Sequence, residues 1–195
     1  MATPLGIYSH LIAPPEGMTL MLREKVMSLS GDSFEIKNNL GQDVFRVQGR
    51  VASLSGRKSL FDMQGRHLFD IQKEHFHWHT TFAANDPQGQ KLMEVKSGFK
   101  LIGSKATATF KNAFSGASET LEMAGNWLST SANIVDTRTG ATVGTIQRKL
   151  SGRDLLFGQQ TYALVIPGGV DMAVMVAMCI AMDEKNNDKP GGLIF

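Results

Sequence analysis

The residues best suited to binding a ligand are four lysines in the middle of the chain. The surrounding pattern predicts two neighbouring strands joined by a turn at Gly103, so Lys100 and Lys105 would meet across that turn. Adjacent ammonium groups can bind a lipid phosphate through charge and hydrogen bonds. Lysines are also common on strands because that face is solvated, and this interpretation stays open beside the first. The four candidate residues are Lys96, Lys100, Lys105 and Lys111.

Other basic residues cluster in the same way and are weaker candidates of the same kind. Such residues on a strand commonly keep the surface soluble or protect a sheet edge from pairing with another chain. These clusters are Arg46 with Arg50, Arg57 with Lys58, and Arg148 with Lys149 and Arg153.

A second candidate site is a run of alternating histidines and aromatic residues. On a strand, His75, His77 and His79 would share one face, and Phe76 and Trp78 the other. Imidazoles can bind zinc, copper or nickel, but successive side chains on one strand face are ~6.5–7 Å apart, so three rarely reach one ion. We therefore predict no metal or other cofactor, aromatic side chains in the core, and a histidine surface able to respond to pH near neutrality.

The sequence contains no recognisable catalytic motif. There is no Gly-x-Ser-x-Gly, phosphate-binding loop, Cys-x-x-Cys or HExxH pattern. The one cysteine, Cys179, lies in the most apolar stretch of the chain, where no histidine is near it in sequence. It cannot form a disulfide within a monomer. We predict that the protein is not an enzyme and that this cysteine is a small buried side chain.

Length and charge limit the remaining classes of protein. The chain has 195 residues, which suits one domain. Twenty basic and eighteen acidic residues leave a net charge of +2, which is too small for the broad positive field of a nucleic-acid-binding protein. Residues 1–15 lack the basic start and long apolar segment of a secretory signal. These features predict a cytoplasmic or nuclear protein with no nucleic-acid partner.

The elements that would position these residues are indicated by an internal repeat. Four turn glycines each follow a polar cluster containing Asn or Asp and precede apolar residues at the third and sixth positions. Because Asn, Asp and Gly tolerate the backbone of tight turns, the repeat predicts hairpins. The first three glycines are 24 residues apart and the last follows after 51, so we expect a degenerate copy at Gly116 with a longer turn or a bulge. The four glycines are Gly41, Gly65, Gly89 and Gly140.

Apolar and polar residues alternate between these turns, as in the segments 34–37 and 106–110. Alternation of this kind is typical of half-buried strands. The span from Leu20 to Ile166 accommodates roughly twelve strands at ~12 residues for each strand and turn. So many antiparallel strands must form two sheets or close into a barrel, because an open sheet leaves exposed edges.

The end of the chain favours the barrel. After the stop at 167–169, a helix is expected that has no polar residue from Met172 to Met182, with Asp171 placed to cap it. A helix that is apolar on every face must be buried, and ~11 apolar residues are too few to cross a bilayer, which needs ~20. We predict a mainly β fold, a closed antiparallel barrel of about twelve strands around this C-terminal helix. The polar run 183–188 should end the helix abruptly.

Several blocks of the sequence, in the same order, resemble the LURP-one-related family of the tubby C-terminal-like group. Residues 20–25 with 34–36 resemble the family's opening hairpin, and residues 41–47 its glycine turn and following strand. Residues 167–171, which lead into an apolar helix, resemble its C-terminal signature. With this resemblance we expect a tubby-like domain over residues 18–184, a loosely structured lead-in at 1–17 and a flexible tail at 185–195.

The resemblance also implies a function. Tubby-like relatives include phosphoinositide-binding domains and phospholipid scramblases, whereas LURP-one-related proteins are associated with defence or stress and have no assigned reaction. It implies a non-enzymatic domain that binds phosphoinositide or another anionic phospholipid at a membrane surface, peripheral at the plasma membrane or nuclear. The alternative is a protein-interaction scaffold with an unknown protein partner and no lipid ligand. Because no long amphipathic surface helix is expected, we predict a monomer.

Overall fold

The structure is a computed structural model that describes residues 3–24, 32–49, 57–74, 80–98, 104–125, 131–147 and 161–187. The strands are β1 (Met18–Glu24), β2 (Asp32–Asn38), β3 (Asp43–Gly49), β4 (Lys58–Asp62), β5 (His67–Glu74), β6 (Thr81–Asn85), β7 (Lys91–Gly98), β8 (Ser104–Lys111), β9 (Ser118–Gly125), β10 (Ser131–Asp136), β11 (Thr142–Gln147) and β12 (Thr161–Ile166). The helices are the 3₁₀ helix η1 (Ser9–Leu11) and the α-helix α1 (Met172–Asn187).

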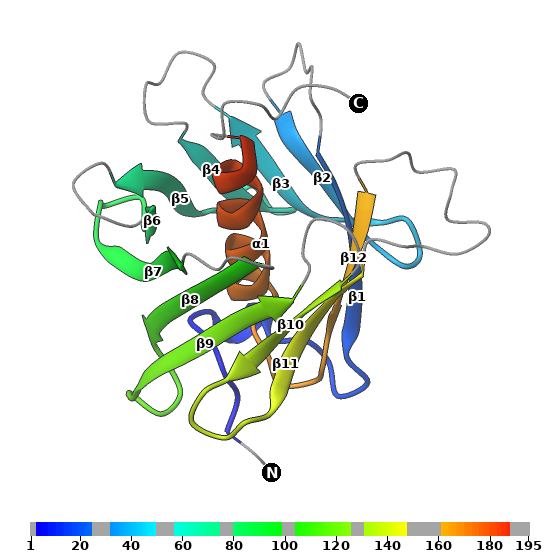
Figure 1. Cartoon of the computed structure of the whole chain (residues 1–195). Coiled ribbons are helices and arrows are strands. Elements are labelled where there is room, and N and C mark those ends of the chain that lie inside the picture. Colours follow the sequence, from blue (N-terminus) through cyan, green and yellow to red (C-terminus); the bar gives the residue numbers. More distant parts are fainter. Residues whose placement is uncertain are drawn as a thin grey trace.

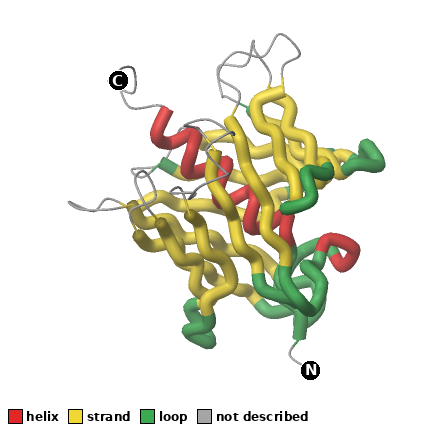
Figure 2. Tube along the Cα trace, turned by 90° about the vertical axis from the view of Figure 1, so that its right-hand side faces the viewer, coloured by secondary structure: helices red, strands yellow, loops and turns green. Residues whose placement is uncertain are grey.

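The strands form one closed antiparallel barrel in which each strand pairs with the next along the chain. β12 closes the barrel by pairing with β1, from Met18 with Ile166 to Arg23 with Thr161. Figure 1 shows the wall of strands around α1, and the perpendicular view in Figure 2 shows the helix running through the inside. The predicted barrel around a C-terminal helix is confirmed.

The core consists of α1 and the inward-facing side chains of the strands. Residues 173–182 of the helix are each at most 1% exposed, so every face of this segment contacts the wall. A helix in such a position needs apolar residues all round, and the sequence supplies them. The wall also approaches closely: a Cβ at Gly144 would lie 3.2 Å from the sulfur of Met175. Cys179 is buried, as predicted.

The two ends of the barrel are connected differently. At the turn end, strands are joined by residues 39–42, 63–66, 86–90, 112–117 and 137–141. At the opposite end, here called the connection end, they are joined by residues 25–31, 50–57, 75–80, 99–103, 126–130 and 148–160.

Each connection at the turn end follows or begins with an Asn or Asp whose side chain binds the turn backbone. Asn38 Oδ1, for example, accepts hydrogen bonds from the N–H groups of Leu40 and Gln42, each at 3.0 Å. The four predicted turn glycines and Gly116 all adopt a positive φ between 69° and 88°. The degenerate copy at Gly116 is therefore confirmed, and its turn is longer, with Gly116 N donating to Asn112 O at 2.8 Å.

Residues 3–17 differ from the loosely structured lead-in that we expected for 1–17. They close the turn end by pairing with the segment before α1: Leu5 N donates to Gly169 O at 2.9 Å, and Ala13 N to Val170 O at 2.8 Å. Leu11 and Ala13 are buried against the core. The expectation failed because the partners of this segment, both backbone groups and side chains, are far away in the sequence.

Asp171 connects this N-terminal segment to α1. Its Oδ1 accepts the N–H of Ala173 at 2.8 Å, so the predicted helix cap is confirmed. Its Oδ2 accepts the N–H groups of Ile7 at 2.9 Å and Tyr8 at 2.7 Å. Burial raises the pKa of the Asp171 carboxyl, although these backbone donors act in the opposite direction. One fully buried side chain thus holds two segments together.

The helix continues to Asn187, through most of the polar run 183–188 that was expected to end it abruptly and through the first three residues of the tail expected at 185–195. Its polar residues find partners on the strands at the connection end. Tyr162 Oη donates to Asp183 Oδ2 at 2.8 Å, and Lys58 forms an ion pair with Glu184. The prediction was wrong because strands remote in sequence stabilise these polar side chains within the helix.

Candidate functional site

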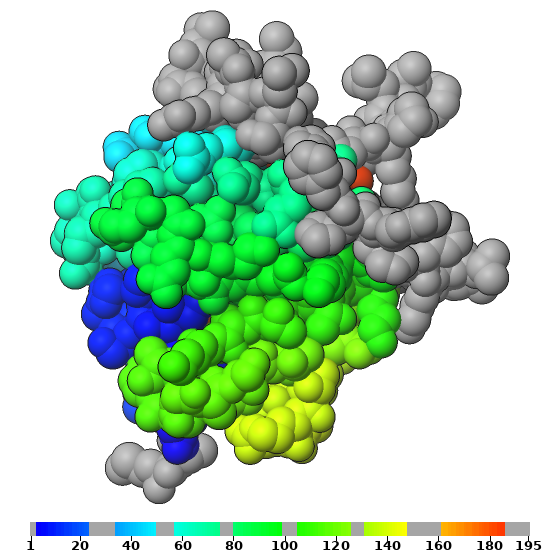
Figure 3. Space-filling model, turned by 90° about the vertical axis from the view of Figure 1, so that its left-hand side faces the viewer, coloured from blue at the N-terminus to red at the C-terminus, as the bar shows by residue number. Residues whose placement is uncertain are grey.

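The structure distributes the predicted lysine site over the outer barrel wall. Lys96 lies on β7, and Lys105 and Lys111 lie on β8, with their buried neighbours facing the core. In the register of these strands, Lys105 pairs with Gly98 and Lys96 with Thr107, so the two lysines are offset along the wall. Figure 3 views this side of the molecule, with β7 and β8 in green. Lys100 lies outside the described residues, so the expectation that it meets Lys105 across a turn stays a prediction.

Two of these lysines are paired with carboxylates. Lys96 Nζ lies 2.6 Å from Glu94 Oε1, and Lys105 Nζ lies 2.7 Å from Glu122 Oε2. The outer face of β7–β9 therefore alternates in charge. An arriving phosphate would have to compete with carboxylates that are already in contact, which makes this wall a poor anion site.

The same pattern continues towards β5. Lys91 Nζ lies 2.6 Å from Glu74 Oε1 and 3.5 Å from Glu94 Oε2. The hydrogen bond from Lys96, together with the charges of Lys96 and Lys91, lowers the pKa of Glu94 despite the opposing effect of its partial burial. These contacts form a solvent-exposed network of ion pairs along the outer wall of the barrel.

The histidine candidates His75, His77 and His79 lie outside the described residues, so the expectation about them stays a prediction. Across the ranges that the structure describes, no group of three or more His, Cys, Asp or Glu side chains could hold a metal ion.

A serine, a histidine and an aspartate do meet on the outer face of β4 and β5. Ser59 Oγ donates to Asp70 Oδ1 at 2.5 Å, and His67 Nε2 lies 3.0 Å from the same oxygen. In a Ser–His–Asp triad the imidazole must lie between the other two groups, and here the carboxylate does. Arg57 Nη2, 2.7 Å from Asp70 Oδ2, completes a cluster that ties β4 to β5 and does not activate the hydroxyl.

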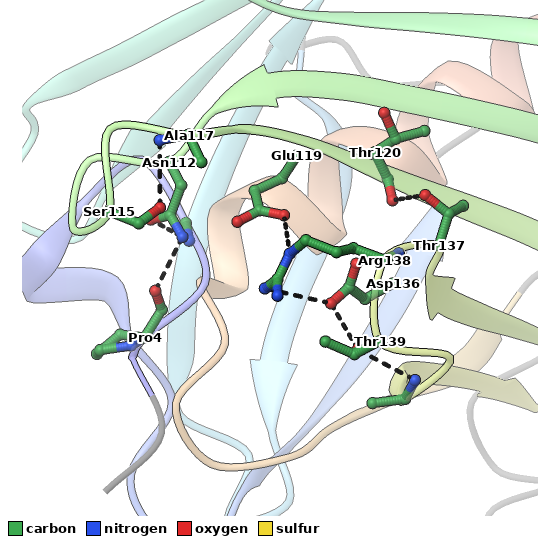
Figure 4. A network of polar contacts seen from close by, with 12 residues as sticks. Pro4, Asn112, Ser115, Ala117, Glu119, Thr120, Asp136, Thr137, Arg138 and Thr139 are labelled. Carbon is green, nitrogen blue, oxygen red and sulfur yellow. Dashed lines mark hydrogen bonds and ion pairs between the residues drawn. The ribbon is translucent and has the colours of Figure 1, made fainter.

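Charged side chains at the turn end are held in a polar network (Figure 4). Arg138 Nε donates to Glu119 Oε2 at 3.2 Å, and Glu119 is only 2% exposed. Arg138 Nη2 also lies 3.9 Å from Asp136 Oδ2. In the same network, Asn112 Nδ2 donates to the carbonyl oxygen of Pro4 at 3.1 Å. The arginine charge is thus neutralised by carboxylates of β9 and β10, and the network stabilises the turns and the N-terminal segment.

A groove that we did not anticipate from the sequence lies beside the β2–β3 turn. Its volume is about 590 Å³, and it is lined by parts of the N-terminal segment, β1, β11 and β12. Leu40 and Val165, which both line it, are 76% and 37% exposed. The available sequence signals were Gly144 within a strand and Pro167 directly after one, since both residue types mark interrupted pairing.

Comparison with known proteins assigns the fold to a family. The LURP-one-related family model matches residues 18–183. The chain belongs to the LURP-one-related family. The resemblance noted in the sequence is therefore confirmed, and the family match includes all twelve strands and most of α1.

Relatives in Arabidopsis thaliana align with most of the chain. Protein LURP-one-related 10 is 20% identical over 190 residues, covering 94% of this chain and 98% of that protein. Protein LURP1 is 21% identical over 189 residues, covering 94% and 91%. Protein LURP-one-related 12 is 26% identical over 168 residues, covering 83% and 74%. These names describe no enzymatic activity.

An X-ray structure of a protein from Arabidopsis thaliana is similar to this LURP-one-related chain, with a TM-score of 0.64 and 15% identity. The alignment covers 91% of this chain and 95% of that one, and it supports the shared fold. Within the described ranges, no helix combines the length and apolar character needed to cross a membrane.

Proposed function

We propose that this LURP-one-related protein is a non-enzymatic domain that attaches to anionic phospholipid, including phosphoinositide, at a cytoplasmic membrane surface through its connection end. The observation that carries the proposal is the positive charge of the segments that join the strands at the connection end. Apart from Arg57, which is ion-paired with Asp70, they contain six basic residues and one acidic residue, Asp154. The six are Lys25, Arg50, Lys100, Arg148, Lys149 and Arg153.

The positions of the tryptophans also favour the connection end as the end that binds the membrane. Both tryptophans of the chain, Trp78 and Trp127, belong to connections that begin and end there. Tryptophan is favoured at the interface between water and lipid because its ring is apolar while its N–H remains polar. The connections at the turn end contain no tryptophan.

The arginines of the turn-end connections and two of the wall lysines are less available to a lipid, because carboxylates already contact them. Lys111 is exposed, but it lies at the opposite end of β8 from the basic connections. The turn-end connections contain Arg66 and Arg138, and each is ion-paired with a carboxylate. Lys96 and Lys105 on the wall are paired as well. The proposal therefore moves the predicted lipid site from the lysine strands to the connection end and keeps only Lys100 of the original four.

The test is sedimentation of the full chain with phosphatidylcholine vesicles of graded phosphoinositide content, at low and at physiological salt. We expect saturable binding that weakens with salt. Charge reversal of Lys100 and Lys149 to Glu should weaken it by about tenfold or more, because each cation near an anionic surface contributes ~1 kcal/mol. The matched control reverses Lys96 and Lys111 on the wall and should change binding less.

Two outcomes would contradict the proposal. Equal losses in the two double variants would show that only total charge matters, and binding no stronger than to neutral vesicles would exclude the membrane function. In the second case a protein-interaction scaffold becomes the better account of the domain.

A further inference from the structure

We propose that the groove at the turn end binds an extended peptide segment of a partner protein. The segment should carry apolar side chains at alternating positions and a basic residue. This inference is independent of membrane attachment, since the groove lies at the opposite end of the barrel from the basic connections. It adds a second binding function to the membrane attachment proposed for the connection end.

The groove exists because two neighbouring strands separate. β11 and β12 form only three residue pairs, and the pairing towards the turn end stops at Thr145 with Val165. Beyond that point β11 stays paired with β10 as far as Thr142, and β12 stays paired with β1 as far as Ile166. Residues 142–144 of β11 thus continue in extended form along the groove without β12 beside them, whereas β12 continues by Ile166 alone before Pro167. Extended strand edges of this kind are the surfaces to which peptides add as a further strand.

The walls of the groove are packed too tightly to collapse into it. Gly17 has a φ of +82°, and a Cβ at this position would lie 2.7 Å from the carbonyl oxygen of Ile166. A Cβ at Gly168 would lie 2.5 Å from the carbonyl oxygen of Pro15. Pro167 has no N–H group with which to extend the pairing of β12. Because the site is formed in advance, a peptide would not have to order it, which favours binding.

The chemistry of the lining selects the kind of occupant. Leu40 and Val165 offer apolar contacts, and Thr19 and Thr145 offer hydroxyl groups. Among the described residues that line the groove, Glu16 is the sole charged side chain. A phosphate or other anion would therefore meet no cation from these residues and would be repelled by the carboxylate. A peptide matches this lining if its apolar residues contact Leu40 and Val165, its polar groups bond to the threonine hydroxyls, and one Lys or Arg pairs with Glu16.

The experiment selects random phage-displayed peptides on the immobilised full chain, with counter-selection on a Val165→Arg variant that fills the groove. Enriched peptides are then synthesised with a fluorescent label, and their affinities are measured by anisotropy. We expect sequences with alternating apolar residues and a Lys or Arg. Leu40→Lys and Glu16→Lys should each weaken binding by about tenfold.

Met63→Lys is the matched control, because Met63 is another exposed apolar residue, 50% accessible, in the equivalent turn between β4 and β5. It should leave peptide affinity unchanged. All variants replace exposed side chains, and thermal unfolding checks that each is folded. The proposal is overturned if no peptide prefers the wild-type chain to Val165→Arg, or if Met63→Lys weakens binding as much as Leu40→Lys.

Discussion

At the turn end the connections between strands have four to six residues, whereas at the connection end they have five to thirteen. The turn-end connections are stabilised locally by Asn and Asp side chains that bind the turn backbone, and their arginines are neutralised by neighbouring carboxylates. The connection end carries unbalanced positive charge in sequence. The turn-end connections are therefore specified by structural requirements, whereas the proposed membrane attachment would use connections whose sequence the fold does not need in this way.

The largest effect should come from Asp171→Ala at the turn end. The substitution removes the acceptor of three backbone N–H groups, on Ile7, Tyr8 and Ala173. We expect the free energy of unfolding to fall by about 3–5 kcal/mol, because one buried and two partly buried donors are left without partners. Chemical denaturation measures this change. Asp86→Ala, which also removes an acceptor of two turn N–H groups but at an exposed site, should cost only ~1 kcal/mol, and equal losses would contradict the central role of Asp171.

A smaller effect is expected for Tyr162→Phe, which removes the helix anchor at the connection end. The lost hydrogen bond to Asp183 is buried, so we expect a decrease of about 1–2 kcal/mol in the free energy of unfolding. Tyr8→Phe is the matched change at the turn end, where the hydroxyl donates to Leu68 O at 2.6 Å. If Tyr162→Phe costs as much as Asp171→Ala, the helix is held equally strongly at both ends, and the larger role given to Asp171 is wrong.

The smallest effect concerns the wall between the two ends. The pKa of Glu94 is lowered first by its hydrogen bond from Lys96, so this pair contributes stability above the ordinary value near 4.5 and loses it as pH falls through the folded-state pKa. Lys96→Met should therefore reduce the free energy of unfolding by less than ~1 kcal/mol at neutral pH and by nothing in strong acid. Denaturation at both pH values tests this, with Lys111→Met as the control. A loss that persists in acid would show that packing, not charge, is responsible.

The turns and the helix could be predicted from the sequence because their causes are local. Asn or Asp followed by Gly specifies a tight turn wherever it occurs, and an uninterrupted apolar segment must be buried. The same reasoning found Gly116, which has a positive φ, although the third and sixth residues after it are not apolar. The number of strands left two sheets or a closed barrel as alternatives, and the apolar helix, which must be buried on every face, favoured the barrel.

The remaining features depend on residues that meet only after folding. Nothing near residues 3–17 indicates that Gly169 and Asp171 are their partners. The charge of Lys105 seemed available because the strand register that brings Glu122 beside it was unknown. The pair of Glu94 and Lys96 is different, because side chains two residues apart on a strand share a face and this contact could have been anticipated. The groove was missed for a related reason, since a separation between β11 and β12 leaves only weak marks in either strand alone.

The helix α1 is the last element of the barrel in chain order, yet it forms the centre of the core. During synthesis the strands emerge first, so inward-facing residues such as Ile71 and Val95, on strands that contact α1, lack this packing partner until the helix follows. Proteins that depend on such long-range contacts fold slowly and expose apolar surface in the meantime. Stable folding therefore has to wait until α1 has left the ribosome, and nascent chains stalled before it should be substrates for chaperones and proteases.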